Sequence, residues 1–187
     1  MPDILTAFGL SASAGLNAYI PLLMIAVAAR LDLIQLQSPF NLLATGWAIA
    51  VLAILLVVEV LADKFPLVDH ANDMLMLFIR PAAGAVLFAA STGTVDSMNP
   101  TLAIVLGILV AGSTHAAKAT ARPMVTASTG GIGNPIVSTI EDVAAFVTSL
   151  VAIVAPLLIG IAVLVFAVFV LSWLNRRGGR TANAGSG

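Results

Sequence analysis

The stretch STGGIGNPIVSTIEDVAAF, residues 128–146, interrupts an otherwise apolar chain with three glycines, an Asn-Pro pair and two adjacent carboxylates. Glycine allows irregular backbone, which a bilayer tolerates only where the backbone is buried in protein or lines a wet cavity. The Asn134-Pro135 pair ends the irregular part. We therefore predict a hairpin tip that is followed by the start of a helix.

Polar side chains follow this break. Ser138 and Glu141 have the spacing of a capping box, in which Ser accepts from a backbone N–H and Glu reaches back. The free N–H groups and the positive end of the helix dipole could instead bind an anion, while Glu141 or Asp142 carries a proton or a cation. Two carboxylates weaken the anion interpretation unless Lys118 or Arg122 balances them.

The composition sets the class of protein. Of 187 residues, 60% are hydrophobic and 9% are charged, and the mean hydropathy is +1.08, which predicts an all-α integral membrane protein. The net charge of −1 argues against a nucleic-acid partner. The absence of cysteine excludes disulfides, thiolate metal sites and a thiol nucleophile. No secretory signal is evident, so we expect residue 1 to be the mature start.

Several apolar segments approach the length of about 20 residues that a spanning helix needs. They are Trp47–Ala62, Thr101–Ala117 and Pro156–Leu174. The run from Ile140 to Ser172 is too long for one untilted span, so Pro156 should kink or divide it. We predict about four to six transmembrane helices.

Ile4–Ala29 is also long enough to span, but Gly15, Asn17 and Pro21 interrupt it. We predict two broken or re-entrant segments, near 11–21 and 123–138. Each places Gly, Asn and Pro close together, which is typical of the inverted repeats of transporters. Chance similarity in apolar sequence is the alternative.

Residues 67–79 are predicted to form a short interfacial amphipathic helix. Asp69 and Asp73 share one face of it. His70 points about 100° away from Asp69, so we predict no metal there. Residues 81–90 are too short to span and could form a half-crossing.

Glu59 and Asp63 share a helix face at the end of the Trp47 segment. Lys64 is expected at the interface, whereas Glu59 lies deeper and is expected to be buried or to face a cavity.

His115, Lys118 and Arg122 form a cationic stripe that ends at a proline. The stripe could be the cytoplasmic end of a span. Alternatively, it could pair with Glu59, Asp63 or Glu141, or seat an anionic headgroup.

The end of the chain differs from the rest. Residues 175–187 are basic and then rich in Gly, Ser and Asn, which predicts a disordered tail. Its arginines favour a cytoplasmic C-terminus. Residues 1–174 are predicted to form a single membrane domain.

The strings GLNAYIPLL, VEVLADKFPLVDHANDMLMLFIRPAAGA, HAAKATARP and STGGIGNPIVSTIEDVAAF resemble a bacterial family of small multi-pass membrane proteins, domain of unknown function four-one-two-six. The resemblance covers residues 5–172 and implies the bacterial cytoplasmic (inner) membrane. The architecture is also similar to DedA-type membrane proteins, a family linked to proton-dependent transport and movement of lipid or polyprenyl phosphate.

We predict a small transporter or flippase-like protein, proton- or cation-coupled, that moves a small solute or an anionic lipid between two broken helices. A structural or assembly protein and an ion or water channel are the alternatives. No enzyme is predicted, because no spacing brings a nucleophile and a base together, and no cofactor is expected. Membrane lipids and a second copy of the chain are the expected partners. The candidate substrate- and ion-binding residues are Asn17, Glu59, Asp63, Asp69, Asp73, Arg80, His115, Lys118, Arg122, Asn134, Ser138, Glu141 and Asp142.

Overall fold

A computed structural model describes residues 2–62, 66–91, 98–130 and 132–183, which contain seven α-helices and one 3-10 turn. The elements are α1 (Pro2–Leu16), α2 (Tyr19–Arg30), η1 (Phe40–Ala44), α3 (Gly46–Ala62), α4 (Pro66–Ser91), α5 (Pro100–Thr129), α6 (Asn134–Val154) and α7 (Pro156–Asn183). No strand occurs in these ranges, so the predicted all-α class is confirmed.

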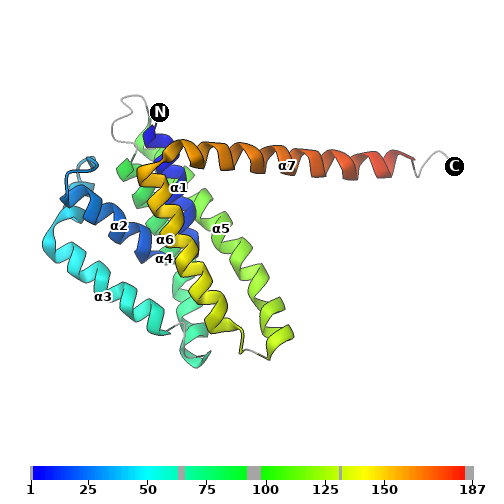
Figure 1. Cartoon of the computed structure of the whole chain (residues 1–187), viewed down its shortest axis with the longest axis horizontal. Coiled ribbons are helices and arrows are strands. Elements are labelled where there is room, and N and C mark those ends of the chain that lie inside the picture. The colour runs from blue at the N-terminus through cyan, green and yellow to red at the C-terminus, as the bar shows by residue number, and fades with distance from the viewer. Residues whose placement is uncertain (1, 63–65, 92–97, 131, 184–187) are drawn as a thin grey trace.

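Helix α1 lies at the centre of the bundle and packs against α4, α5, α6 and the start of α7, whereas α2 and α3 flank the bundle on one side (Figure 1). Small residues allow this close packing. A Cβ on Gly15 would overlap Thr114 and the Ala111 carbonyl of α5, and a Cβ on Gly9 would overlap Ala152 of α6. Small residues at such contacts let helix backbones approach each other in lipid.

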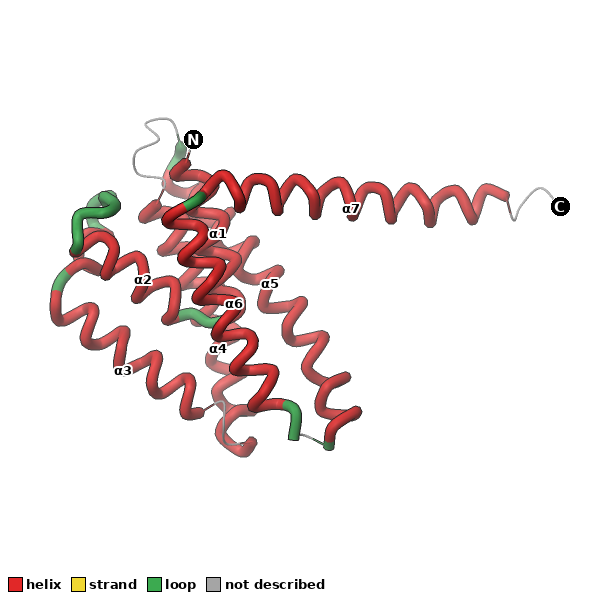
Figure 2. The backbone as a smooth tube through the Cα atoms, in the orientation of Figure 1, coloured by secondary structure: helices red, strands yellow, loops and turns green. Residues whose placement is uncertain are grey.

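The predicted break near 11–21 is confirmed and lies between Leu16 and Tyr19. Helices α1 and α2 measure roughly 22 and 18 Å at 1.5 Å per residue, so neither reaches across a hydrocarbon core of about 30 Å. Beyond α2, Phe40 packs in one cluster with Ala7 and Phe88. The chain therefore returns to the side where α1 begins, and α1 and α2 form a V with Asn17 at its point (Figure 2).

The second break is narrower than the predicted 123–138. Helix α5 continues through Pro123 to Thr129, and α6 begins at Asn134. Gly130 ends α5 in the left-handed conformation, with φ of 60°, which glycine adopts without steric cost. Residues 130–133 thus carry the tip of the α5–α6 hairpin, with Gly131 outside the described residues.

The predicted capping box is wrong. Ser138 and Glu141 lie inside α6, because Pro135 occupies its first turn and the helix is already formed when Ser138 is reached. Gly133 holds the N-cap position, and its N–H donates to Thr129 Oγ1 at 3.1 Å. The start of α6 is therefore anchored to the end of α5 rather than to its own serine.

Residues 67–79 do not form a separate short helix. They belong to α4, which runs without interruption from Pro66 through Pro81 to Ser91. Pro81 removes one backbone N–H, but α4 packs against α1 and α5, with Gly84 in close contact with both, and this packing stabilises the helix. The half-crossing proposed for 81–90 is the second half of this helix.

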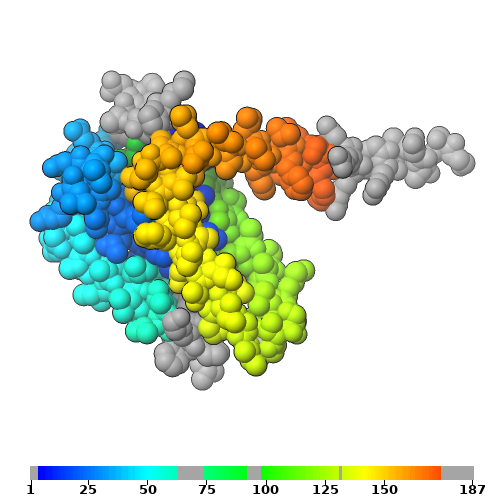
Figure 3. Space-filling view, in the orientation of Figure 1, coloured from blue at the N-terminus to red at the C-terminus, as the bar shows by residue number. Residues whose placement is uncertain are grey.

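Pro156 divides the long C-terminal apolar run, as predicted, since α6 ends at Val154 and α7 begins at Pro156. Helix α7 projects away from the bundle (Figure 3). It continues to Asn183, and no proline follows Pro156 to end the helix. The division into a membrane domain of residues 1–174 and a disordered tail of residues 175–187 stays a prediction. Residues 184–187 lie outside the described residues.

Four helices are long and apolar enough to cross a membrane, judged by length and composition. These are Met74–Ser91, Pro100–Thr129, Asn134–Val154 and Pro156–Trp173. The finding agrees with the predicted number of spans. The predicted segment that begins at Trp47 is part of α3, which is apolar but shorter than these four spans. The predicted segment that begins at Thr101 lies within the longer helix α5.

Helices α4 and α5 cross at a pair of glycines. A Cβ on Gly107 would overlap the Gly84 carbonyl group and the Ala85 backbone, whereas a Cβ on Gly112 of the same helix would meet nothing within 4 Å. We expect Gly107→Ala to lower the free energy of unfolding by about 1–3 kcal/mol, because backbone must shift. Gly112→Ala should stabilise the helix by about 0.5–1 kcal/mol. Thermal unfolding in detergent measures both, and equal effects would contradict the close crossing.

Candidate functional site

The deepest polar contacts join α3, α4 and α5. Arg80 Nη2 lies 3.1 Å from Glu59 Oε1, and Arg80 Nη1 lies 3.1 Å from His115 Nδ1. All three residues are buried. Arginine only donates hydrogen bonds, so His115 Nδ1 must accept, and the imidazole is neutral with its proton on Nε2. The predicted burial of Glu59 is confirmed. A buried carboxylate needs an oppositely charged partner, and the Arg80 guanidinium provides one.

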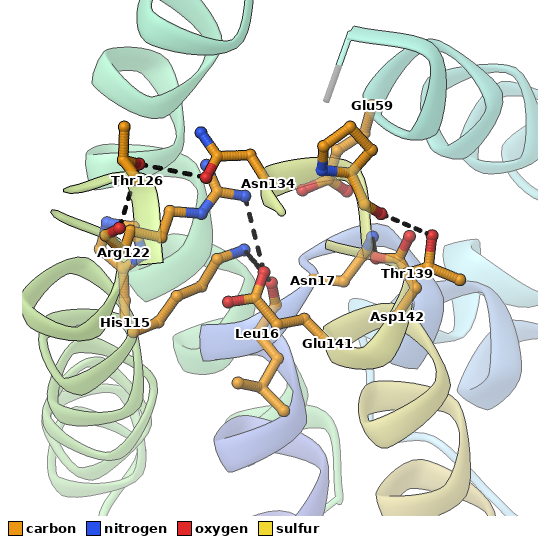
Figure 4. A network of polar contacts seen from close by, with 12 residues as sticks. Leu16, Asn17, Glu59, His115, Arg122, Thr126, Asn134, Thr139, Glu141 and Asp142 are labelled. Carbon is orange, nitrogen blue, oxygen red and sulfur yellow. Dashed lines mark hydrogen bonds and ion pairs between the residues drawn. The ribbon is translucent and has the colours of Figure 1, made fainter. Parts of the chain in front are cut away.

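A second ionic group lies between α5 and α6. Glu141 Oε2 is 2.8 Å from Lys118 Nζ and 3.5 Å from Arg122 Nη2. Both cations come from one face of α5, and Arg122 extends toward Glu141 (Figure 4). The Lys118 side chain is 3% exposed and the other two are 13% exposed. This group is therefore nearer the surface than the Arg80 contacts.

Lys118 links Glu141 to the end of α1. Its Nζ lies 2.8 Å from Glu141 Oε2, the distance of a charge-assisted hydrogen bond. Lys118 Nζ also donates to the carbonyl of Leu16 at 3.1 Å, at the end of α1. A cation at this position also complements the negative end of the α1 dipole.

Asn17 connects the break to α6. The N–H groups of Tyr19 and Ile20 both donate to Asn17 Oδ1 at 3.0 Å, as at a capped helix start. Asn17 Nδ2 donates to Asp142 Oδ1 at 2.9 Å. The two backbone donors fix which amide atom is oxygen, so Asp142 must be the acceptor in the second contact.

The two predicted breaks make different contacts. Asn17 reaches Asp142 partway along α6, while Asn134 accepts from Thr126 at the hairpin tip at 3.1 Å (Figure 4). The first break thus meets the arms of the α5–α6 hairpin rather than its tip. Ser138 is buried on α6 between these two levels.

Three predicted site residues cannot be placed. Asp63 lies outside the described residues, and the side chains of Asp69 and Asp73, in α4, also lie outside the described part. Among the residues that were described, no group of three His, Cys, Asp or Glu side chains could hold a metal ion.

Hydroxyl contacts of α1 were not foreseen from the sequence. Ser13 Oγ donates to the Ala145 carbonyl at 2.7 Å and lies 2.7 Å from Ser149 Oγ, while Ser11 Oγ donates to the Gly84 carbonyl at 2.9 Å. These bonds join α1 to α6 and α4. The alternation of small and hydroxyl residues along residues 7–15 was the available signal.

Opposite charges meet throughout this part of the bundle. Among the described residues, the cations are Arg80, Lys118 and Arg122, and the carboxylates are Glu59, Glu141 and Asp142. Contacts between opposite charges are expected where ionisable groups are removed from water.

Fold and site together define an all-helical membrane protein that has buried ion pairs beside a broken pair of helices. The particular family is shown by residues 4–176, which match the family model described as a domain of unknown function (DUF4126), and the chain belongs to this family. The family predicted from the sequence is thus confirmed. No curated protein and no solved structure matches the chain.

Proposed function

We propose that the protein is a small transporter or flippase-like protein of the bacterial cytoplasmic membrane. It moves a small solute or an anionic lipid past the point of the α1–α2 V, coupled to a proton or a cation. The observation that carries this proposal is that buried polar side chains meet both broken helix ends: the Lys118 cation donates to the end of α1, and the neutral Asn17 amide accepts at the start of α2. Ion and substrate sites of transporters are built in this way.

Two further features support the proposal. The return of the chain to the side where α1 begins is the shape that a re-entrant element would have, and it supports the proposal. The exposure of the ionic groups falls from Arg122 and Glu141 through Lys118 to the buried Arg80. A graded set of charges of this kind suits a pathway that opens at the α5–α6 hairpin end.

A structural role is the second candidate, and the hydroxyl bonds of α1 favour it. Ser11 and Ser13 tie three helices together without any charge. On this view the ion pairs also serve only to lock the bundle. The two candidates differ in what the neutral variants of the carboxylates do.

We expect Glu59→Gln and Glu141→Gln each to reduce flux in proteoliposomes at least about tenfold while the variants remain folded, because each removes a charge that the pathway uses. Flux is measured with a fluorescent phosphatidylglycerol analogue and with a soluble organic anion. Asp32→Asn is the matched control: Asp32 is exposed with φ of 58°, a conformation that Asn tolerates.

Unchanged flux in both glutamine variants would refute the transporter proposal. Loss of the folded protein in both, with normal flux in the control, would favour the structural role. Flux that rises linearly with substrate concentration, without saturation, would point to a channel.

A further inference from the structure

The end of α1 holds a cation that belongs to the chain itself. Lys118 Nζ donates to the Leu16 carbonyl at 3.1 Å and lies 2.8 Å from Glu141 Oε2, so one ammonium group joins a carbonyl and a carboxylate (Figure 4). The Lys118 side chain is 3% exposed. The ammonium group is therefore held out of bulk water, by oxygen atoms, at the point where α1 stops.

These oxygen atoms are of the kind that bind a monovalent metal cation. The last carbonyl groups of a helix lack partners inside the helix and form the negative end of its dipole. In transporters with broken helices, such carbonyl groups coordinate the coupling ion. Carbonyl and carboxylate oxygens are also the ligands that hard cations prefer. The ammonium group of a lysine is a compact point charge, so Lys118 Nζ can take the place of such a cation.

Three different helices contribute to this contact. Helix α5 supplies the lysine, α1 the carbonyl group and α6 the carboxylate. Arg122, one turn further along α5, lies 3.5 Å from the same Glu141 oxygen, and its side chain is more exposed, at 13%. Lys118 is therefore the cation that closes the end of α1.

We propose that the end of α1 is a monovalent-cation site, and that the tethered ammonium group of Lys118 fills it permanently. A tethered ammonium group cannot leave with the substrate, so no free Na⁺ or K⁺ is carried at this point. This inference rests on the proposed transport function and narrows its coupling ion to a proton. It also states what the oxygen atoms bind once the lysine side chain is removed, namely a small monovalent cation.

The test is the dependence of thermal stability on the cation, followed by circular dichroism in detergent. The unmodified protein is expected to unfold at the same Tm in KCl, NaCl, ammonium chloride and N-methylglucamine chloride, because its site is filled. Lys118→Ala opens the site. In at least one of the first three salts, its Tm should exceed that in N-methylglucamine chloride by about 2–4 °C. The rise should saturate at constant ionic strength, which separates binding from screening.

Matched variants separate the site from a general effect of salt. Lys118→Met keeps an apolar stem in place and should lose stability without responding to the cation, because the stem fills the space. Lys118→Ala combined with Glu141→Gln lacks the charged ligand and should bind the cation about tenfold more weakly. Arg30→Ala removes an exposed cation, and its Tm should not depend on the salt. If Lys118→Ala does not fold in N-methylglucamine chloride, its recovery as folded protein in one of the other salts decides.

An equal Tm of Lys118→Ala in all of these salts would overturn the inference, as would its failure to fold in every one of them. A Tm of the unmodified protein that depends on the choice of cation would overturn the permanent occupation of the site. Flux is a separate measurement, and replacing Na⁺ and K⁺ by N-methylglucamine should leave it unchanged in the unmodified protein. Flux that requires Na⁺ or K⁺ would remove this inference and leave the proposed function standing. A cation response of Lys118→Ala without flux in the unmodified protein would remove the proposed function and leave the cation site.

Discussion

Arg80→Met is expected to lower the free energy of unfolding by about 3–5 kcal/mol, because it leaves the buried Glu59 carboxylate without its guanidinium. Arg80 joins Glu59 of α3 and His115 of α5, and its side chain is buried. Its loss also removes the donor to His115 Nδ1. Thermal unfolding in detergent, followed by circular dichroism, measures the change.

The double variant Glu59→Leu with Arg80→Met is expected to recover much of this loss. Removing both partners leaves no buried charge, and a buried ion pair often contributes little compared with apolar groups of similar size. Arg30→Met is the matched control, since Arg30 is exposed and, within the described part of the chain, donates to the Ala44 carbonyl at 3.2 Å. An Arg80→Met effect no larger than that of the control would show that the Glu59–Arg80 pair does not hold α3 to the bundle.

Asn17→Leu is expected to lower the free energy of unfolding by about 2–4 kcal/mol and to abolish flux. The substitution removes the acceptor for the Tyr19 and Ile20 N–H groups and the donor to Asp142. Loss of a cap costs about 1 kcal/mol, and a buried polar group left unsatisfied costs about 1–3 kcal/mol. The point of the V would lose the contacts that hold it against α6.

Asn17→Ser separates the two contributions. Serine retains an oxygen that can accept from the start of α2, but it does not reach Asp142 as the amide does. We expect about 1 kcal/mol of destabilisation and a partial loss of flux. Equal stability losses in the serine and leucine variants would show that the contact with Asp142, rather than the cap, determines the effect.

The class of protein and the two breaks could be predicted because they depend on local chemistry. A chain that is 60% hydrophobic has no soluble alternative. At Gly130 the backbone leaves the helical conformation because glycine has the conformational freedom to do so. At Asn17 it does so with the help of the hydrogen bonds that the Asn17 side chain makes. Pro156 ends one helix and begins the next for an equally local reason.

Predictions failed where packing overrode local signals. Pro81 and Pro123 both lie inside helices, although proline disfavours a helix interior by about 3 kcal/mol. In α4, packing against α1 and α5 offsets this cost. The capping box failed because Ser138 and Glu141 have the right spacing, but the helix begins earlier.

The sequence shows which residues are charged, but it does not predict which of them pair with each other. The cationic stripe of α5 had three candidate partners at the level of the sequence, namely Glu59, Asp63 and Glu141. In the folded bundle, Lys118 and Arg122 pair with Glu141. Glu59 pairs with Arg80, which also contacts His115. No spacing along the chain predicts these contacts, because each joins different helices.

The sequence by itself determined that this protein is a helical membrane protein, where its helices break and which residues carry charge, because hydrophobicity, glycine and proline act within a few residues. Only the tertiary structure decided that α1 lies at the centre and that the point of its V meets Lys118 and Asp142. Those contacts depend on how helices distant in the chain pack together. The grouping of Lys118 and Arg122 around Glu141 therefore depends on the folded bundle.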